Sequence, residues 1–222
     1  MGGADRARKA LHSLTHRGPD QWGEWRDDKV YMGHRRLSIL DLSERGRQPM
    51  ADQEGRVVVA VNGEIYNFQG LRRELEPRHA FTSQSDSEVV LHGYKEWGIE
   101  GLLERIDGMY AFCIYDVDRQ RIYLARDRAG IKPIYYALIN GAFAWASELK
   151  ALREFFGRDR LEPDVTALYD FLTYLYVPAP KSLYRNVFKL EPGHFACFDL
   201  SSGRLDIKPY WHLDATAREW SE

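Results

Sequence analysis

Apolar and polar positions follow two different periods along the chain, which predicts both helices and strands. Apolar residues recur at helical spacing in five segments, namely 4–15, 67–75, 85–97, 149–156 and 165–175. The clearest is 85–97, where Ser85 or Asp86 is placed to cap the helix and Glu88 falls near its third position. This arrangement is typical of a capping box.

Strands are expected where β-branched and aromatic residues gather between turn residues. The predicted strands are 29–42, 56–61, 109–116, 121–127, 134–139, 142–146, 183–190 and 194–200. Asn62-Gly63 is expected to end the second strand, and Asn140-Gly141 predicts a hairpin turn. Strands come in clusters with few helices between them, so the order favours an α+β domain of antiparallel sheets covered by helices.

Composition narrows the class of protein. The 222 residues are enough for one large domain or a domain with an appendage. A net charge of −2, with both signs interspersed, gives no electrostatic case for a nucleic-acid or membrane-surface partner. The apolar runs are too short to span a membrane. No secretory signal follows Met1, and only two cysteines are present, which favours a cytoplasmic setting.

Six short segments carry most of the functional information. They are 16–20 (HRGPD) with Gly23; 33–43 with Gly46, Gln48 and Pro49; 61–67; 85–89; 108–112; and 124–128 with 130–133. Each is weak alone, because an Asn-Gly pair is normally a turn and an Asp before Ser-Glu is normally a cap. Together, in this order and at these spacings, they resemble class II glutamine amidotransferases, and HRGPD, RRLSI-x-DLS and GIKP resemble the asparagine synthetase branch.

The resemblance covers about residue 11 to 211 and implies a fold. That fold is the four-layer αββα sandwich of N-terminal-nucleophile hydrolases, with two antiparallel sheets and, here, the first strand missing. It implies a type-2 glutamine amidotransferase domain at 1–190, followed at 191–222 by final strands and the start of a linker. The linker resembles the approach to an ATP-dependent synthetase domain. No cofactor is expected in the present domain, since ATP and magnesium belong to the synthetase domain.

Hydrolysis of the glutamine side-chain amide needs a nucleophile, a base and donors for the oxyanion. The resemblance assigns the oxyanion hole to the side chain of Asn62 and the backbone N–H of Gly63. In the family the nucleophile is an N-terminal cysteine whose own α-amine, with a pKa of about 7.7–8.0, is the base. The chain begins Met1-Gly2-Gly3, so that cysteine strand has no counterpart.

Other residues are expected to hold the amino-acid end of glutamine. The guanidinium of Arg36 matches the α-carboxylate, and Asp86 would accept from the α-ammonium, with the Gly63 carbonyl and Glu64 nearby. The backbone of Leu37 and Ile39 would line the carboxylate end. Opposite charges placed for a zwitterionic amino acid support this arrangement independently of the resemblance.

Neither cysteine is expected to replace the missing nucleophile. Cys113 and Cys197 are flanked by large apolar residues in predicted strands, so both are predicted to be buried and inert. The seven histidines show no metal-ligand spacing, and no metal is expected.

Three functional hypotheses remain open. The first is the glutaminase domain of a glutamine-dependent asparagine synthetase-like enzyme, which in its complete form converts Asp, Gln and ATP to Asn, Glu, AMP and pyrophosphate. The chain alone would be inactive, with L-glutamine, a synthetase domain in cis or in trans, and a second copy in a homodimer as its partners. The second is a non-catalytic docking or structural domain of a related amide- or lactam-forming synthetase. The third is a glutamine sensor. The retained glutamine-binding residues favour the first.

Overall fold

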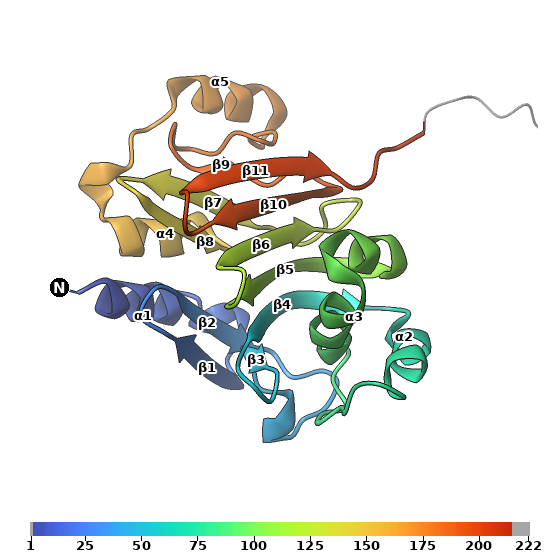
Figure 1. The fold of residues 1–222 in the computed structure, drawn as a ribbon. Helices are drawn as coiled ribbons and strands as arrows, with labels where there is room; N and C mark the ends of the chain where they lie inside the picture. The colour runs from blue at the N-terminus through green and yellow to red at the C-terminus, as the bar shows by residue number, and fades with distance from the viewer. Residues whose placement is uncertain (1, 215–222) are drawn as a thin grey trace, which may run out of the picture.

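The computed structural model describes residues 2–214, which fold into two β-layers between two helical layers (Figure 1). The helices are α1 (Gly3–Ser13), α2 (Phe68–Leu75), α3 (Glu88–Arg105), α4 (Leu149–Phe156) and α5 (Val165–Tyr174). The strands are β1 (Gln21–Arg26), β2 (Tyr31–Arg36), β3 (Met50–Ala51), β4 (Val57–Ile65), β5 (Gly108–Asp116), β6 (Arg121–Arg126), β7 (Tyr135–Ile139), β8 (Ala142–Ala146), β9 (Phe188–Lys189), β10 (His194–Asp199) and β11 (Arg204–Pro209). The predicted α+β sandwich is confirmed.

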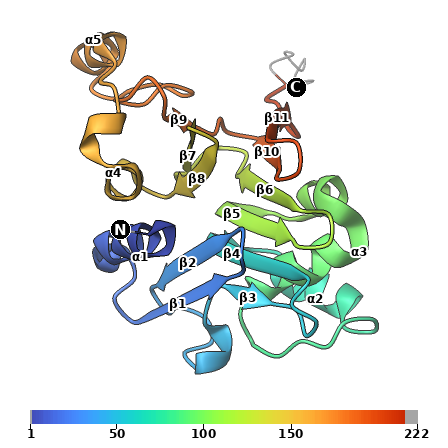
Figure 2. The same ribbon diagram turned by 60° about the vertical axis from the view of Figure 1, so that its left-hand side comes forward.

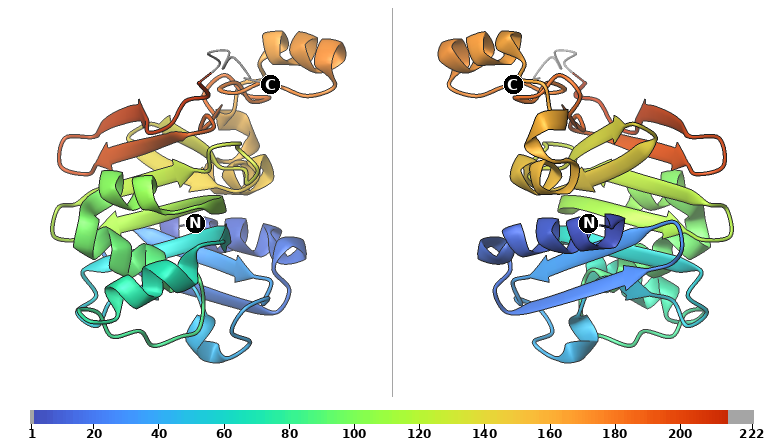
Figure 3. Two further views of the ribbon diagram at one scale, coloured as in Figure 1. Left: turned by 90° about the vertical axis from the view of Figure 1, so that its right-hand side faces the viewer. Right: turned by 90° about the vertical axis from the view of Figure 1, so that its left-hand side faces the viewer.

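The first β-layer is an antiparallel sheet with strand order β11-β10-β6-β5-β4-β3. Nearly every residue of β5 is buried, because α2 and α3 cover one face of this sheet and the second β-layer covers the other (Figure 3). Val59, Val61 and Phe112 pack toward the helices, while Val58 and Cys113 pack toward the second layer. A strand that is buried on both faces has apolar residues at consecutive positions, which explains why β5 is apolar along most of its length.

The second β-layer is divided. One part is the β1-β2 hairpin and the other is the β8-β7-β9 sheet (Figure 2). Helices α1 and α4 pack side by side over this layer, with the guanidinium carbon of Arg6 5.7 Å from the ring centre of Phe155. The interruption of this layer lies between β2 and β8.

Several predicted strand boundaries are wrong. Asn62-Gly63 does not end a strand, because β4 continues to Ile65 and pairs with β5 along its whole length. Of the predicted strand 29–42, only the residues of β2 form a strand. Of the predicted strand 183–190, only the two residues of β9 do. The strands β1 and β11 have no counterpart among the predicted strands. The expected linker residues 215–222 lie outside the described part of the chain.

The start of α3 also differs from expectation. The helix begins at Glu88, and its N-cap residue, Ser87, makes no side-chain capping bond. The predicted capping box is therefore wrong, since the Glu88 carboxylate accepts from the backbone N–H groups of Thr82 and Ser83 instead. The helix is interrupted at Gly98, whose φ is 71°.

The helix α5 stands apart from the sandwich (Figure 3). Its Asp170 forms an ion pair with Lys181 at 2.7 Å, and its Ala167 is buried. Most of its large apolar side chains are exposed, namely those of Val165, Leu168, Tyr169, Phe171, Leu172 and Tyr174. Among the described residues, no helix is long and apolar enough to cross a membrane.

Candidate functional site

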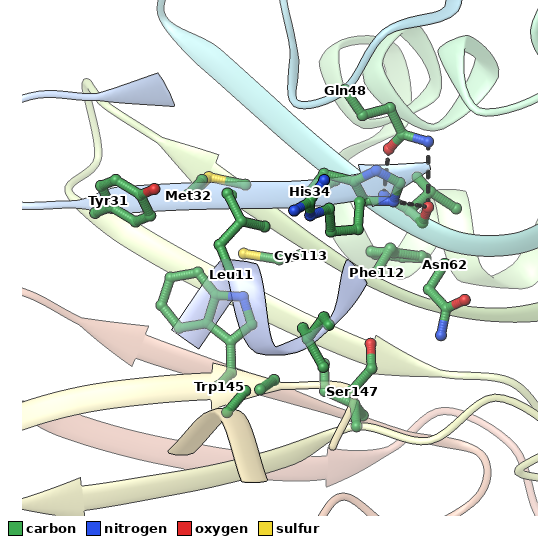
Figure 4. Close-up of a pocket in the computed structure, with 18 of the residues that line it drawn as sticks. Leu11, Tyr31, Met32, His34, Gln48, Asn62, Phe112, Cys113, Trp145 and Ser147 are labelled. Carbon is green, nitrogen blue, oxygen red and sulfur yellow. Dashed lines mark hydrogen bonds between the residues drawn. The ribbon is translucent and has the colours of Figure 1, made fainter. Parts of the chain in front are cut away.

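A cavity of about 990 Å³ runs between the two parts of the second β-layer (Figure 4). Met32 on β2 and Trp145 on β8 line its sides, and Cys113 on β5 lines its floor. Leu11 on α1 and Leu152 on α4 close it from above. Voids in folded cores rarely exceed the size of a water molecule, so this space is suited to an occupant.

All seven residues predicted to bind glutamine line this one cavity. They are Arg36, Leu37, Ile39, Asn62, Gly63, Glu64 and Asp86. They come from three places in the fold: the end of β2 and the loop after it, the end of β4, and the segment before α3. Their roles in binding stay predictions, but the fold brings them to a common space.

Asn62 and Gly63 lie inside β4, beside β5. Gly63 has a φ of 147°, and a Cβ there would lie 2.0 Å from the Met109 carbonyl oxygen, so only glycine fits. The Nδ2 of Asn62 is buried and has no hydrogen-bond partner among the described residues. Figure 4 shows its amide group projecting into the cavity. A buried donor without a partner is costly, so this amide is available to a ligand oxygen.

Arg36 is buried and holds the loop that follows β2. Its Nη2 donates to the carbonyl oxygens of Leu40 and Asp41, at 2.7 Å each. Its Nη1 donates to Oε1 of Gln21 at 2.8 Å. Of the five N–H groups of a guanidinium, two remain for a ligand. Arg36 can therefore attract a carboxylate while it fixes the loop, but Nη2 has no hydrogen left to donate.

Asp86 is buried at the edge of the cavity. Its Oδ2 accepts from the backbone N–H of Ile65 at 2.8 Å, which ties the segment before α3 to the end of β4. Burial raises the pKa of the Asp86 carboxyl, and the charge of Glu64 raises it further. A bound cation would offset this desolvation, so the position suits an ammonium group.

Two polar residues that line the cavity, Gln48 and His34, are not among those predicted to bind glutamine. Gln48 bonds Val61 through its side-chain amide, and His34 donates from Nε2 to the Val61 carbonyl at 3.0 Å. Burial lowers the pKa of His34 to about 4, and its Nδ1 is buried without a partner. Gln48 and His34 both belong to the family segment 33–43 with Gly46, Gln48 and Pro49. This membership is the sequence signal that sets them apart from other polar residues.

The cysteines differ in their surroundings. Cys113 is buried, as predicted, and burial raises the pKa of its thiol well above the ordinary value. Cys197 is only partly buried, so the prediction that it is buried is wrong. Cys197 lies on β10, next to the exposed edge strand β11, whereas Cys113 lies on β5 inside the sheet. Within residues 2–214, no group of three or more His, Cys, Asp or Glu side chains could hold a metal ion.

Comparison with known proteins adds independent evidence. Residues 2–211 match the family model described as a glutamine amidotransferase domain. The chain is similar to glutamine-hydrolyzing asparagine synthetase 1 of Bacillus subtilis, with 40% identity over 181 residues, which covers 81% of this chain and 28% of the relative. It is also similar to the amidase chry2 of Gibberella zeae, with 35% identity over 209 residues, 92% of this chain and 30% of the relative.

A solved structure shares the fold. The glutamine phosphoribosylpyrophosphate amidotransferase of Bacillus subtilis matches with a TM-score of 0.66 at 21% identity, over 91% of this chain and 45% of that one. At this identity the likeness concerns the fold alone. The chain spans less than a third of the length of these two curated relatives and less than half of this solved chain.

Proposed function

The chain belongs to the glutamine amidotransferase domain family, and from that premise we propose that it binds glutamine as the ammonia-supplying part of an asparagine synthetase-like protein. The observation that carries the proposal is the convergence of Arg36, Asp86, Asn62 and Gly63 on one cavity. Their charges and donors match the carboxylate, ammonium and amide groups of a single glutamine molecule. The names of both similar relatives, a glutamine-hydrolyzing asparagine synthetase and an amidase, refer to reactions of amide groups. This supports an amide such as glutamine as the ligand.

In the proposed pose, glutamine lies along the Arg36 end of the cavity. Its α-carboxylate faces Arg36 and the backbone of Leu37 and Ile39, and its α-ammonium faces Asp86. Its side-chain amide oxygen then points to the Asn62 Nδ2, which has no partner among the described residues. Such donors are most useful when they are in place before negative charge develops on that oxygen.

Hydrolysis would convert glutamine and water to glutamate and ammonia. A nucleophile attacks the amide carbon, the oxyanion is held by Asn62 and Gly63, and ammonia leaves after it gains a proton. The described residues offer only Cys113 as a thiol in the cavity, and burial keeps that thiol protonated. We therefore propose that the chain alone binds glutamine without hydrolysing it.

The complete reaction would need a second part. We propose that residues 1–190 form the amidotransferase domain and that 191–222 lead toward a synthetase domain, supplied in cis or in trans, which uses ATP and magnesium to convert Asp to Asn with the released ammonia. The apolar side chains exposed on α5 support a large partner surface, since isolated chains rarely expose such patches.

Isothermal titration of the chain with L-glutamine tests the proposal. We expect binding that weakens at least about tenfold in Arg36→Ala and in Asp86→Asn, because each removes one charged partner of the ligand. Arg73→Ala, at an exposed arginine of α2, is the matched control and should bind like the wild type. Equal affinity in all four proteins would contradict the assigned pose, and circular dichroism spectra would exclude unfolding as the cause of any loss.

A further inference from the structure

The segment that leads into α3 contains a buried carboxylate that the proposed glutamine pose does not use. Residues 81–87 form neither helix nor strand. Most of the polar side chains from here to the start of α3 are nevertheless buried, namely those of Ser83, Ser85, Asp86, Ser87 and Glu88. Because a buried irregular segment has no ladder of backbone hydrogen bonds, its order depends on the bonds that side chains make to it.

The carboxylate of Glu88 is the central acceptor of this segment. Its Oε1 accepts from the backbone N–H of Thr82 at 2.7 Å and from the Thr82 hydroxyl at 3.0 Å. Its Oε2 accepts from the backbone N–H of Ser83 at 2.8 Å and from the Ser83 hydroxyl at 2.5 Å. Burial by itself would raise the pKa of Glu88, but hydrogen bonds from His92 and from these donors lower it to about 2. Glu88 is therefore ionised near neutral pH.

Hydrogen bonds continue from Glu88 to both sides of Asp86. The Ser83 hydroxyl, which donates to Glu88, accepts from the backbone N–H of Ser85 at 3.1 Å. The Ser85 hydroxyl accepts in turn from the backbone N–H of Ser87 at 3.3 Å. The backbone on either side of Asp86 is thus held by a short series of bonds that begins at the Glu88 carboxylate.

These bonds are not those of an ordinary helix start. An acidic residue in the first turn of a helix is usually favoured by the helix dipole or by the free N–H groups of that turn. The Glu88 carboxylate instead turns back to Thr82 and Ser83, which precede α3. Its contacts indicate that it shapes the segment that carries Asp86.

We propose that Glu88 is a positioning residue of the glutamine site, which acts through Ser83 and Ser85 to hold the Asp86 carboxylate toward the α-ammonium of the ligand. This inference rests on the proposed function and names a further residue of the same site. The carboxylate end of the site is held separately, because Arg36 bonds the loop after β2 directly. Loss of Glu88 should therefore weaken recognition of the ammonium group and leave recognition of the carboxylate in place.

Two ligands separate this role from a general loss of structure. Glu88→Gln keeps the size of the side chain but replaces one oxygen by an NH2 group, which cannot accept. L-Glutamine should bind this variant at least about fivefold more weakly than the wild type. Glutaramate, which is glutamine without its α-ammonium, should bind the two proteins with affinities within about twofold of each other. Nuclear magnetic resonance titration measures both ligands, including weak binding.

A matched control and a milder variant accompany Glu88→Gln. Glu96 is another carboxylate of α3 with a histidine partner, His79 at 3.1 Å, so Glu96→Gln should bind both ligands like the wild type. Ser83→Ala removes the hydroxyl between Glu88 and Ser85 and leaves the carboxylate in place. It should show the same selective loss of glutamine affinity, and it decides the question where Glu88→Gln does not fold.

Hydrogen exchange at Ile65 tests the position of Asp86 without any ligand. The Ile65 N–H donates to Asp86 Oδ2 at 2.8 Å, so displacement of Asp86 in Glu88→Gln should speed exchange at Ile65 at least about tenfold relative to Val59 in the same strand. Unchanged relative exchange at Ile65, or an equal loss of affinity for both ligands, would overturn the positioning role. Failure of the wild type to bind L-glutamine would instead overturn the proposed function, while exchange at Ile65 would still decide whether Glu88 positions Asp86.

Discussion

The side-chain amide of Gln48 bonds both backbone groups of Val61. Its Oε1 accepts from the Val61 N–H at 2.6 Å, and its Nε2 donates to the Val61 carbonyl at 3.2 Å. The pairing of β3 with β4 stops at Met50 and Val59, so the Gln48 side chain continues it where no strand is present. The backbone that carries Asn62 and Gly63 is thus fixed on one edge by β5 and on the other by a side chain.

Replacement of Gln48 should weaken both the fold and the site. Gln48→Ala leaves the buried Val61 N–H without a partner, which we expect to cost about 1–3 kcal/mol of unfolding free energy. Glutamine affinity should fall as well, because Asn62 follows directly. Chemical denaturation and calorimetry measure the two effects. Gln53→Ala, at an exposed position in the turn before β4, is the control, and equal stability of the two variants would contradict the role of Gln48.

His34 should make the chain sensitive to mild acid. Burial lowers its pKa to about 4 in the folded chain, against 6.5 for an ordinary histidine. As the pH falls below 6.5, His34 gains a proton in the unfolded chain but not in the folded chain. The free energy of unfolding therefore falls as the pH drops from 6.5 toward about 4. We expect a loss of roughly 1 kcal/mol per pH unit between these values, seen in denaturation midpoints across the range.

The variant His34→Gln isolates this effect. A glutamine amide can still donate to the Val61 carbonyl but does not titrate, so the slope of stability against pH should flatten. His212→Gln, at an exposed position, should keep the wild-type slope. A wild-type slope in His34→Gln would assign the acid sensitivity to other groups.

The sequence correctly predicts that Asn62 and Gly63 belong with the other residues of the cavity. It does not predict that they lie inside the strand β4. Local propensity favours a turn at Asn62-Gly63. Pairing with β5 overrides this propensity, and Gly63 is needed for a different reason, because a Cβ at this position would lie 2.0 Å from the Met109 carbonyl oxygen. Local patterns report neither long-range pairing nor close approach of two strands.

The division of the second β-layer is predictable only in part. Resemblance predicts two stacked antiparallel sheets, but not that β2 and β8 lie apart with a cavity between them. The strand β1 is not predicted from the sequence, because its polar and aromatic residues do not alternate with a two-residue period. Only Gly23 in this strand is buried. Contacts between distant segments, such as Arg17 with Glu148, hold this arrangement and leave no local pattern.

Asp86 should make glutamine binding dependent on pH. Its carboxyl has a raised pKa in the free chain because it is buried, and only the ionised form attracts an ammonium group. Affinity should therefore decline as pH falls through a value above the ordinary 3.8 of aspartate. Calorimetry over a pH series measures this, and binding at the lower end should release protons because the ligand favours the ionised form.

Asp86→Asn should separate binding from folding. The side-chain oxygen of asparagine can still accept from the Ile65 N–H, while the charge that burial disfavours is removed. A group with a raised folded-state pKa loses stability as pH rises through that pKa, so the variant should be at least as stable as the wild type near neutral pH. Asp159→Asn, at an exposed position, should change neither property. A marked loss of stability in Asp86→Asn alone would show that the carboxylate is structural.

Cys113 should be unreactive although it lines the cavity. Burial raises the pKa of its thiol well above the ordinary 9.0, so almost none of it is thiolate near neutral pH. We expect iodoacetamide to leave Cys113 unmodified in the folded chain and to modify it after unfolding in guanidinium, as read by mass spectrometry of its peptide. Glutamate release from glutamine should stay at background and be the same in Cys113→Ala. Release that disappears in Cys113→Ala would instead make this thiol the nucleophile, and the proposal that the chain alone only binds glutamine would fail.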